Sequence, residues 1–559
     1  MRVCWPSGVS ILAALVLHFA ACGAAFAQAG ASSASAQPDA AAANKSSGSD
    51  PSFDILEFRI EGNSVLPTID VERAVMPFLG PKRHFADVES ARKALEDLYQ
   101  KRGYQTVFVE IPEQKISRGA IRLHVLEGQV ERTRVVGSRY FLLSEIRSKA
   151  SDLAPGSVPD FNAVQQELAQ LNKLPDRQVS PILKPGRTPG GVEVELSVRD
   201  ELPLHGDIEI DNHASPFTSS ERANASLRYD NLWQREHSIA INYQVAPQKR
   251  SEANVVYGTY LWRFAESDDV ISLYAIRSNS DIAVVGSASI LGNARIYGAR
   301  WIHPLGSGTS GGSSYFHSVT LGIDRKDFGQ TNASAQTGNA TVYPPISYSP
   351  LSLSYGANLV REQGSVQFSI GPSTAPRGVF GNSDAEFIGR RVLSGGAGYV
   401  ALKMDSSVEQ WVSRRWSGYG RLQGQYTSDA LIPNEQFIMG GFDTVRGYRE
   451  SEVTGDRGAQ ATLEARFYPI GRPQLDGKRQ LYALAFGDAA SVRFVAPQGA
   501  QVHGNVLGSV GLGLRAQGWH GLHAAADVAD ALHDGGSGVG GPITRKGAKR
   551  VDASLGWSF

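Results

Sequence analysis

Polar and apolar residues alternate with a period of two in segment after segment between Leu204 and Phe559. Ala223, Ala225, Leu227 and Tyr229 are separated by polar residues, and Ile239, Ile241 and Tyr243 repeat the pattern. Successive side chains of a strand point to opposite faces, so each segment predicts a strand with one apolar and one polar face. Because no helical spacing intervenes, the strands are expected to be antiparallel.

Two architectures satisfy this pattern, a soluble sandwich and a transmembrane β-barrel. The alternating segments have about the 9–11 residues that a strand needs to cross a bilayer. Aromatic residues fall near strand ends, as an interfacial girdle requires; they include Trp233, Tyr243, Tyr260, Trp262, Trp301 and Trp416. The chain ends with aromatics at its last and third-last positions, Phe559 and Trp557, which resembles the C-terminal signal of bacterial outer-membrane barrels. These features favour an all-β membrane barrel over residues 204–559.

The length of this region suits 16 antiparallel strands, at about 22 residues for each strand and its connection. Fourteen or eighteen strands stay possible on length alone. Outside the N-terminal leader, no apolar run reaches 18 residues, so a membrane-spanning role has to rest on strands.

Residues 1–27 have the features of a secretory signal peptide, with Arg2, a short apolar core and Ala25-Phe26-Ala27 as the cleavage site. The alternative is a lipoprotein modified at Cys22. Residues 28–52 form a low-complexity linker, which is either a disordered tether or a helix that plugs a cavity. Cleavage after Ala27 removes Cys4 and Cys22, the only cysteines, and leaves a chain without disulfides or cysteine metal sites.

Residues 53–129 and 130–200 predict two small α+β domains with the same β-α-α-β-β order. In the first, Leu56, Phe58 and Ile60 are predicted to form the buried face of one strand, and Asp87 to N-cap a helix. In the second, Asp160 is predicted to cap a helix.

The candidate functional element is Val445-Arg446-Gly447-Tyr448, preceded by Gly440 and Gly441. The glycines allow positive φ and close packing, so the stretch predicts a tight loop tip that presents one guanidinium inward. A charge inside a barrel needs a partner, and Asp488 stands alone among small and apolar residues. We predict that Arg446 pairs with Asp488; the alternatives are a solvated arginine and an aspartate that faces the lumen unpaired.

Composition excludes other functions. Lys+Arg and Asp+Glu both number 55, whereas a nucleic-acid binder has a basic excess. No H-E-x-x-H or P-loop motif is present, and the G-x-S-x-G match at residues 308–312 falls in a Gly/Ser-rich segment rather than in a strand-to-helix elbow. We therefore expect no enzyme activity, no metal and no cofactor.

Four stretches make the chain resemble the two-partner secretion transporters of the haemolysin secretion/activation type, within the superfamily of barrel-assembly insertases. Residues 53–130 resemble the family's first periplasmic POTRA domain. Leu171-Asn172-Lys173-Leu174-Pro175 and Leu183-Lys184-Pro185-Gly186 resemble its second. Residues 435–448 and Gly455-Asp456-Arg457-Gly458 resemble the inward-folded sixth extracellular loop, in which Gly440, Gly441 and Asp456 support the tip, and 510–515 resemble a late barrel strand. One departure is Ala490, where the family often has Gly two residues after the wall aspartate.

The resemblance implies a 16-stranded barrel in the outer membrane of a Gram-negative bacterium, inserted by the barrel assembly machinery, with two periplasmic POTRA domains. It implies a monomer that exports one large secreted exoprotein, a β-helical partner with an N-terminal secretion domain; a haemolysin or adhesin activated by export is the expected kind of partner. The main alternative is an insertase that assembles other barrels. A passive porin has no need of the N-terminal domains or of the arginine loop.

Overall fold

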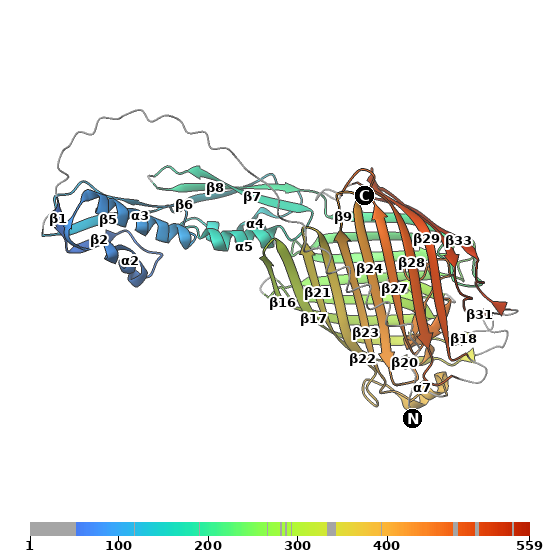
Figure 1. Cartoon of the computed structure of the whole chain (residues 1–559). Coiled ribbons are helices and arrows are strands. Elements are labelled where there is room, and N and C mark those ends of the chain that lie inside the picture. Colours follow the sequence, from blue (N-terminus) through green and yellow to red (C-terminus); the bar gives the residue numbers. More distant parts are fainter. Residues whose placement is uncertain are drawn as a thin grey trace, which may run out of the picture.

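The computed structural model comprises two small N-terminal domains that extend from one end of a large β-barrel (Figure 1). It describes residues 52–559 except 117, 189, 265–266, 280–281, 286–287, 292, 333–341, 393, 473–478, 498–501 and 539–540. The predicted signal peptide and almost all of the predicted linker or plug helix therefore lie outside the described residues. We call the barrel end nearer the N-terminal domains the proximal end and the opposite end the distal end.

The first N-terminal domain packs two helices on a three-stranded sheet of order β2-β5-β4, with β2 parallel to β5. Its apolar core includes Leu95, Tyr99 and Leu123, which are completely buried. The elements are β1 (Phe53–Ile55), β2 (Glu57–Glu61), α2 (Thr68–Val75), the 3-10 turn η1 (Met76–Phe78), β3 (Gly80–Arg83), α3 (Phe85–Lys101), β4 (Val107–Glu110) and β5 (Ala120–Glu127).

Two local predictions in this domain are wrong. Leu56 is 70% exposed, because the chain leaves its pairing with β3 there and begins a new pairing with β5. Asp87 is not the N-cap of α3: the cap is His84, three residues earlier, and Asp87 accepts the backbone N–H of His84 at 2.8 Å. Asp87 thus closes the reciprocal half of a capping box.

The second N-terminal domain repeats the β-α-α-β-β core of the first, with sheet β6-β8-β7 and β6 parallel to β8, whereas the first domain has the pair β1–β3 in addition. Asp160 caps α5 as predicted, accepting the N–H of Asn162 at 2.8 Å. The repeat of two β-α-α-β-β units is therefore confirmed. Its elements are β6 (Val130–Val136), α4 (Leu143–Ser148), the 3-10 turn η2 (Ser151–Leu153), α5 (Phe161–Leu171), β7 (Arg177–Pro185) and β8 (Val192–Asp200).

The rest of the chain closes into an antiparallel barrel with 16 strand positions, as predicted. One position holds two segments, β20 and β21, which both pair with β17 and are separated by Ser349-Pro350. Proline lacks the N–H that a central strand donates, so the strand breaks there. The strands are β9 (Leu204–Asp211), β10 (Arg222–Leu232), β11 (His237–Val245), β12 (Asn254–Arg263), β13 (Val270–Ser278), β16 (Ala294–Ser310), β17 (Ser313–Phe328), β20 (Ile346–Tyr348), β21 (Leu351–Arg361), β22 (Gly364–Thr374), β23 (Val400–Trp411), β24 (Trp416–Thr427), β27 (Arg457–Phe467), β28 (Gln480–Arg493), β29 (Gly504–Trp519), β30 (Leu522–Ala531) and β33 (Lys549–Ser558).

Connections at the distal end carry the remaining elements. These are β14 (Ile282–Val285), β15 (Ala288–Leu291), β18 (Thr331–Asn332), β19 (Val342–Tyr343), α7 (Asp384–Arg390), the 3-10 turn η3 (Pro433–Glu435), β25 (Phe437–Met439), β26 (Val453–Gly455), β31 (Ser537–Gly538) and β32 (Gly541–Pro542).

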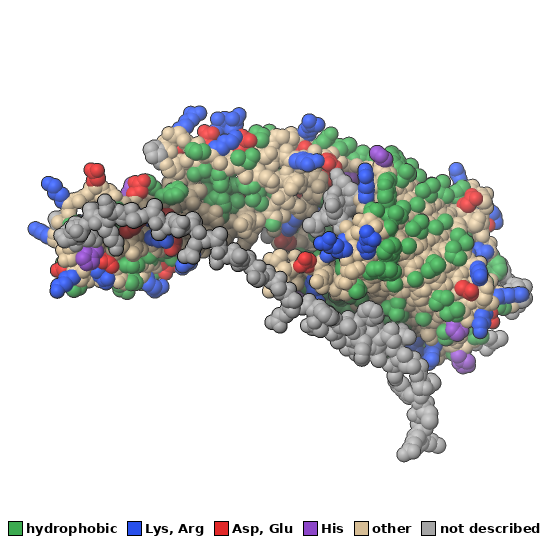
Figure 2. All heavy atoms as spheres, turned by 45° about the horizontal axis from the view of Figure 1, so that its top comes forward, with side chains coloured by type: hydrophobic (Ala, Val, Ile, Leu, Met, Phe, Trp, Pro, Cys, Tyr) green, Lys and Arg blue, Asp and Glu red, His purple; other side chains and the backbone are tan. Residues whose placement is uncertain are grey.

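The barrel wall is apolar outside and polar inside. Ile241, Leu512 and Leu555 are 54%, 67% and 61% exposed on the outer face, and Figure 2 shows hydrophobic side chains over much of the visible wall. Charged residues such as Asp488 and Asp527 are buried inside. An apolar exterior of this extent is typical of a wall that contacts lipid. Among the described residues, no helix is long and apolar enough to cross a membrane.

The first and last strands close the barrel. β33 pairs with β9 from Ser554 opposite Asp211 to Ser558 opposite Asp207. Gly206 and Phe559 exchange both backbone hydrogen bonds at the proximal end, and the Phe559 ring fills the space where a side chain at position 206 would lie. Trp557 donates its indole N–H to His520 O at 3.0 Å. The two predicted terminal aromatics thus lie at the seam.

The second N-terminal domain is joined to proximal turns of the barrel by charged contacts. Arg177 and Lys149 both contact the Glu236 carboxylate at 2.7 Å, and Lys173 contacts Asp268 at 2.6 Å. Burial alone would raise the pKa of Glu236, but hydrogen bonds and positive charge from Lys149 and Arg177 hold it below its usual value. We call these contacts the domain–barrel joint.

Because the pKa of Glu236 is lowered in the folded protein, its contribution is present above the ordinary glutamate pKa of about 4.3 and is lost as pH falls below it. Glu236→Gln should loosen the contacts of the domain–barrel joint at neutral pH. The wild-type protein should show the same loosening in acid, where Glu236 is protonated. Hydrogen exchange of residues 233–236 measures this, with exposed, joint-remote Glu57→Gln as the control. Equal protection in wild type and Glu236→Gln would contradict the prediction.

Candidate functional site: a loop folded into the barrel

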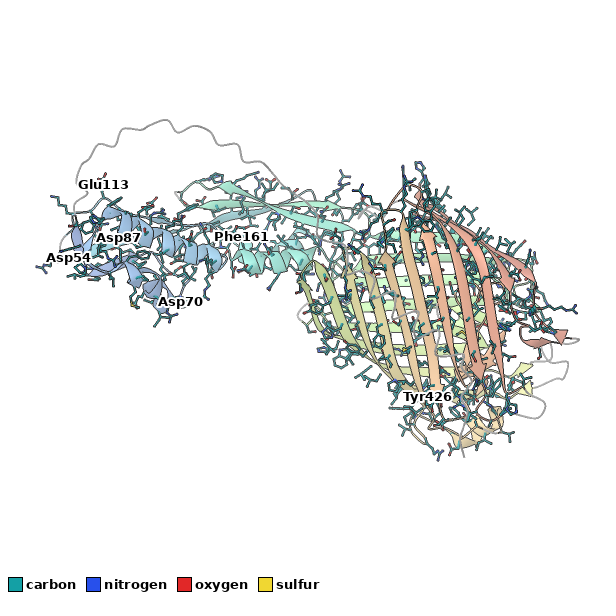
Figure 3. The ribbon with its side chains drawn as sticks, in the orientation of Figure 1. Asp54, Asp70, Asp87, Glu113, Phe161 and Tyr426 are labelled. Carbon is teal, nitrogen blue, oxygen red and sulfur yellow. The ribbon has the colours of Figure 1, made fainter. Side chains whose placement is uncertain are left out.

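The connection between β24 and β27 folds back into the barrel. Tyr426 marks the distal end of β24 (Figure 3). From there the chain forms η3 and the short pair β25–β26, which leaves residues 440–452 as a tip inside the wall. We call this tip the inward loop.

Three glycines give the inward loop its shape. Gly440, Gly441 and Gly447 have φ of 106°, 118° and 88°, a region that favours glycine. Space is equally restricted: a Cβ at Gly441 would lie 2.1 Å from the Glu450 carboxylate, and one at Gly447 would lie 3.0 Å from Ala529 Cβ on β30. The glycines therefore allow both the turn and the contact with the wall.

Arg446 lies at the end of this loop, 4% exposed. Its Nε and Nη2 donate to the two Asp488 oxygens at 2.8 and 2.9 Å, and its backbone N–H donates to Asp488 Oδ2 at 3.1 Å. Such a bidentate pair fixes the plane of the guanidinium as well as its position. The structure thus contains the pair that the sequence predicted, and its importance for function stays a prediction.

Two further carboxylates and one ring complete the Arg446 environment. Nη1 donates to Glu464 on β27 at 2.8 Å and lies 3.9 Å from Asp527 on β30. The Phe486 ring stacks below the guanidinium, with its centroid 3.5 Å from Cζ. A buried cation–π contact of this kind contributes about 2 kcal/mol.

The two further carboxylates, those of Glu464 and Asp527, each pair with an arginine other than Arg446. Arg515 pairs with Asp527 at 2.6 and 2.7 Å, and Arg466 pairs with Glu464 at 2.8 Å. Arginines and carboxylates therefore alternate across β27, β28, β29 and β30, which satisfies the requirement that buried charges be paired. We call this set the lumen network.

Neighbouring residues of the loop are held by packing. Val445 and Tyr448 are completely buried in a cluster with Met439, Ala490 and Leu507. The Tyr448 hydroxyl donates to Gly508 O at 2.9 Å or His533 O at 2.8 Å. Ala490, the departure from the family pattern, therefore contributes an apolar contact to the loop.

Asp456 holds the base of the loop and is fully buried. Its carboxylate accepts the backbone N–H groups of Leu431 and Val495 at 3.0 and 2.8 Å. It also pairs with both terminal nitrogens of Arg391, which follows α7 in the distal connection 375–399. One carboxylate thus ties the inward loop to a second distal connection.

Sequence reasoning missed Arg391, Glu464, Phe486 and Asp527. Glu464 lies directly opposite Phe486, one inward position from the pair Thr462 and Asp488. The alternation of side chains along the strand indicated that Glu464 faces inward. The sequence did not give the strand register that brings Glu464 to Arg446. Trp557 and Phe559 lie at the proximal seam and take no part in the lumen network.

Among the described residues, one group of His and Asp side chains has metal-ligand atoms close together. Asp176, His205 and Asp230 place one such atom each within 4.8 Å of one another beside the domain–barrel joint. His205 Nε2 lies 3.0 Å from Asp176, and Asp230 pairs with Arg228 at 2.7 Å. These three residues form a polar cluster between the second domain and the barrel.

Comparison with known proteins supports the class of protein that this geometry defines, an outer-membrane barrel with periplasmic domains. Residues 53–128 match the POTRA domain of the ShlB type. Residues 349–515, which contain the inward loop and Asp488, match the haemolysin secretion/activation protein ShlB/FhaC/HecB. The predicted resemblance is therefore confirmed.

Individual relatives support the same class of protein. The outer membrane transporter CdiB of Dickeya dadantii (strain 3937) is 25% identical over 417 residues, 73% of this chain and 71% of the relative. The heme/hemopexin transporter protein HuxB of Haemophilus influenzae (strain 86-028NP) is 18% identical over 441 residues, 76% and 74% of the two chains. This protein is homologous to two-partner secretion transporters of the outer membrane.

Solved structures show the same fold. CdiB from Escherichia coli superposes with a TM-score of 0.60 at 17% identity over 93% of each chain. BamA from Haemophilus ducreyi lacking POTRA domains 1–3 gives 0.53 at 14% identity, over 91% of this chain and 100% of that one. The matches to a POTRA domain and to outer-membrane transporters indicate that the proximal end of the barrel faces the periplasm and the distal end faces the cell exterior.

Gly447→Ala should destabilise the folded barrel by about 1–2 kcal/mol, because a side chain adds strain at positive φ and crowds the wall. The temperature at which the purified protein loses its compact mobility in detergent gel electrophoresis measures the effect. Gly395→Ala is the matched control, because Gly395 has open space around its Cβ position. Equal transition temperatures for the two variants would refute the role of Gly447.

Proposed function

We propose that this protein exports one large secreted partner through its barrel, after capturing it in the periplasm. The observation that carries the proposal is the combination, in one chain, of a ShlB-type domain with a barrel that holds the arginine loop. The relatives named as transporters favour export over the insertase alternative. The likeness to BamA supports the fold alone.

Capture is proposed to use strand addition at the N-terminal domains. β7 is an edge strand of the second domain, with Ile182 and Leu183 43% and 40% exposed. β4 is an edge of the first domain, where Phe108 is 54% exposed. Unpaired edges of this kind accept an extended peptide through main-chain hydrogen bonds, and exposed apolar residues add side-chain contacts.

Passage requires the barrel to open. The inward loop occupies the lumen beside β28, and an apolar cluster around Tyr348, Phe387 and Tyr399 joins the distal connection 375–399 to the wall. We infer that export displaces these segments. A helix from residues 28–52 is a further plug on this hypothesis.

The partner is proposed to be β-helical, with an N-terminal secretion domain, and to fold on the outside. Folding beyond the membrane then gives transport its direction without a nucleotide or cofactor. On this proposal the transporter is a monomer, has no enzyme activity, and is inserted by the barrel assembly machinery.

Removing residues 53–199 should abolish export of the proposed secreted partner, while the barrel still reaches the outer membrane. The measurement compares partner in the medium with partner retained in the periplasm. Heat-dependent gel mobility of the shortened protein is the control for a folded barrel. Undiminished export by that protein would refute the capture step.

Arg446→Ala and Asp488→Ala should each reduce export strongly, and the double variant should lose little more. Their losses are expected to be non-additive because the two residues act as one unit. A double-mutant cycle on secreted partner measures the coupling, with Arg361→Ala at the proximal end of β21 as the control. Fully additive losses would show that the pair does not act as a unit in transport.

A further inference from the structure

Two arginines stand directly opposite each other on the outer face of the barrel. Arg277 on β13 pairs in register with Arg295 on β16, and both side chains are exposed. Their neighbours in sequence, Ile276 and Ile296, are buried inside the distal cluster. The alternation of the strands therefore fixes both guanidiniums on the outward, lipid-facing side.

The strand register also fixes the depth of the two arginines relative to the bilayer. Moving toward the proximal end, the next outward rung holds Ala275 and Tyr297, and the following rungs hold Leu273 with Ala299 and Ile271 with Trp301. The arginine rung lies two residues, about 7 Å, beyond Tyr297. Aromatic residues mark the interface of a bilayer, so Arg277 and Arg295 lie at the headgroup level of the outer leaflet.

The two arginines lack a direct polar partner. Across the residues that the structure describes, neither guanidinium has a hydrogen-bond or ion-pair partner. The nearest carboxylate in register is Asp327, opposite Arg295, and it is already engaged by the Ser347 hydroxyl and by Arg325 at 3.5 Å. Like charges directly opposite on neighbouring strands repel. An anion bound between the two arginines attracts both of them and offsets this repulsion.

The surface is hollowed at this point. A cavity of about 440 Å³ is lined by both arginines. Asn279 and Asn293, next to the distal ends of the two strands, add amide groups that bind hydroxyls. Asp327 on the same rim disfavours an anion that fills the whole cavity, and favours a ligand whose phosphate is confined to the arginine side.

We propose that Arg277 and Arg295 bind a phosphate group of a phosphorylated glycolipid headgroup in the outer leaflet. Each guanidinium offers a planar fork that matches phosphate oxygens. Asn279 and Asn293 contact sugar hydroxyls, and the acyl chains lie along the apolar wall below Tyr297. This site is independent of export, because it faces lipid rather than the lumen.

The test titrates the purified full-length protein in detergent with three probes: lipid A carrying its phosphates, the same lipid dephosphorylated, and inorganic phosphate. Wild type should bind phosphorylated lipid A at least about tenfold more tightly than either other probe. The R277Q/R295Q variant should lose that preference. Arg361→Gln is the matched control. Arg361 is exposed at the proximal end of β21, so this substitution removes the same kind of charge on the side of the other leaflet.

Unchanged binding by R277Q/R295Q would overturn the proposal. An equal response to inorganic phosphate would overturn the lipid assignment and define a free-phosphate site. Should the double variant fail to fold, the single variants R277Q and R295Q decide: each is expected to weaken binding, and wild-type affinity in both would refute the site. A conservative R277K/R295K variant, which keeps the charge but loses the forks, should bind with intermediate affinity.

Discussion

The buried charge of Arg446 is the constraint around which the barrel interior is arranged. A guanidinium removed from water is costly unless every donor has a partner. Here Asp488 takes two side-chain donors and a backbone N–H, and Glu464 takes a third nitrogen. These partners come from neighbouring strands, so the loop position and the strand register stabilise each other.

The lumen network also explains why the segment around Arg446 needs glycine and tyrosine at the positions that follow it. Gly447 has to approach Ala529 closely, and Tyr448 has to reach backbone carbonyls of two distal segments. Asp456 then links the base of the loop to Arg391 and so to the connection that carries α7. A movement of any one part changes the contacts of the others, so the opening proposed for export has to involve all of them together.

The outer face obeys a different requirement, since it contacts lipid rather than buried charge. Apolar residues cover the wall, aromatic residues mark its edges, and Arg277 and Arg295 lie exposed at the distal edge. The N-terminal domains face water on most sides and are held to the barrel through Glu236 and its two cations. The chain thus meets three environments: lipid, the water of the lumen, and the periplasm. Each of them accounts for a different distribution of charged residues.

The sequence alone determined the faces of the strands, the domain repeat, the inward arginine and its aspartate partner, because each depends on local alternation or on one distinctive residue. Tertiary structure decided which residues meet across strands. Glu464, Phe486 and Asp527 reach Arg446 through a register that a period of two cannot specify. It also decided that Leu56 is exposed and that Asp87 closes a capping box, because sheet partners and helix starts depend on contacts made far along the chain.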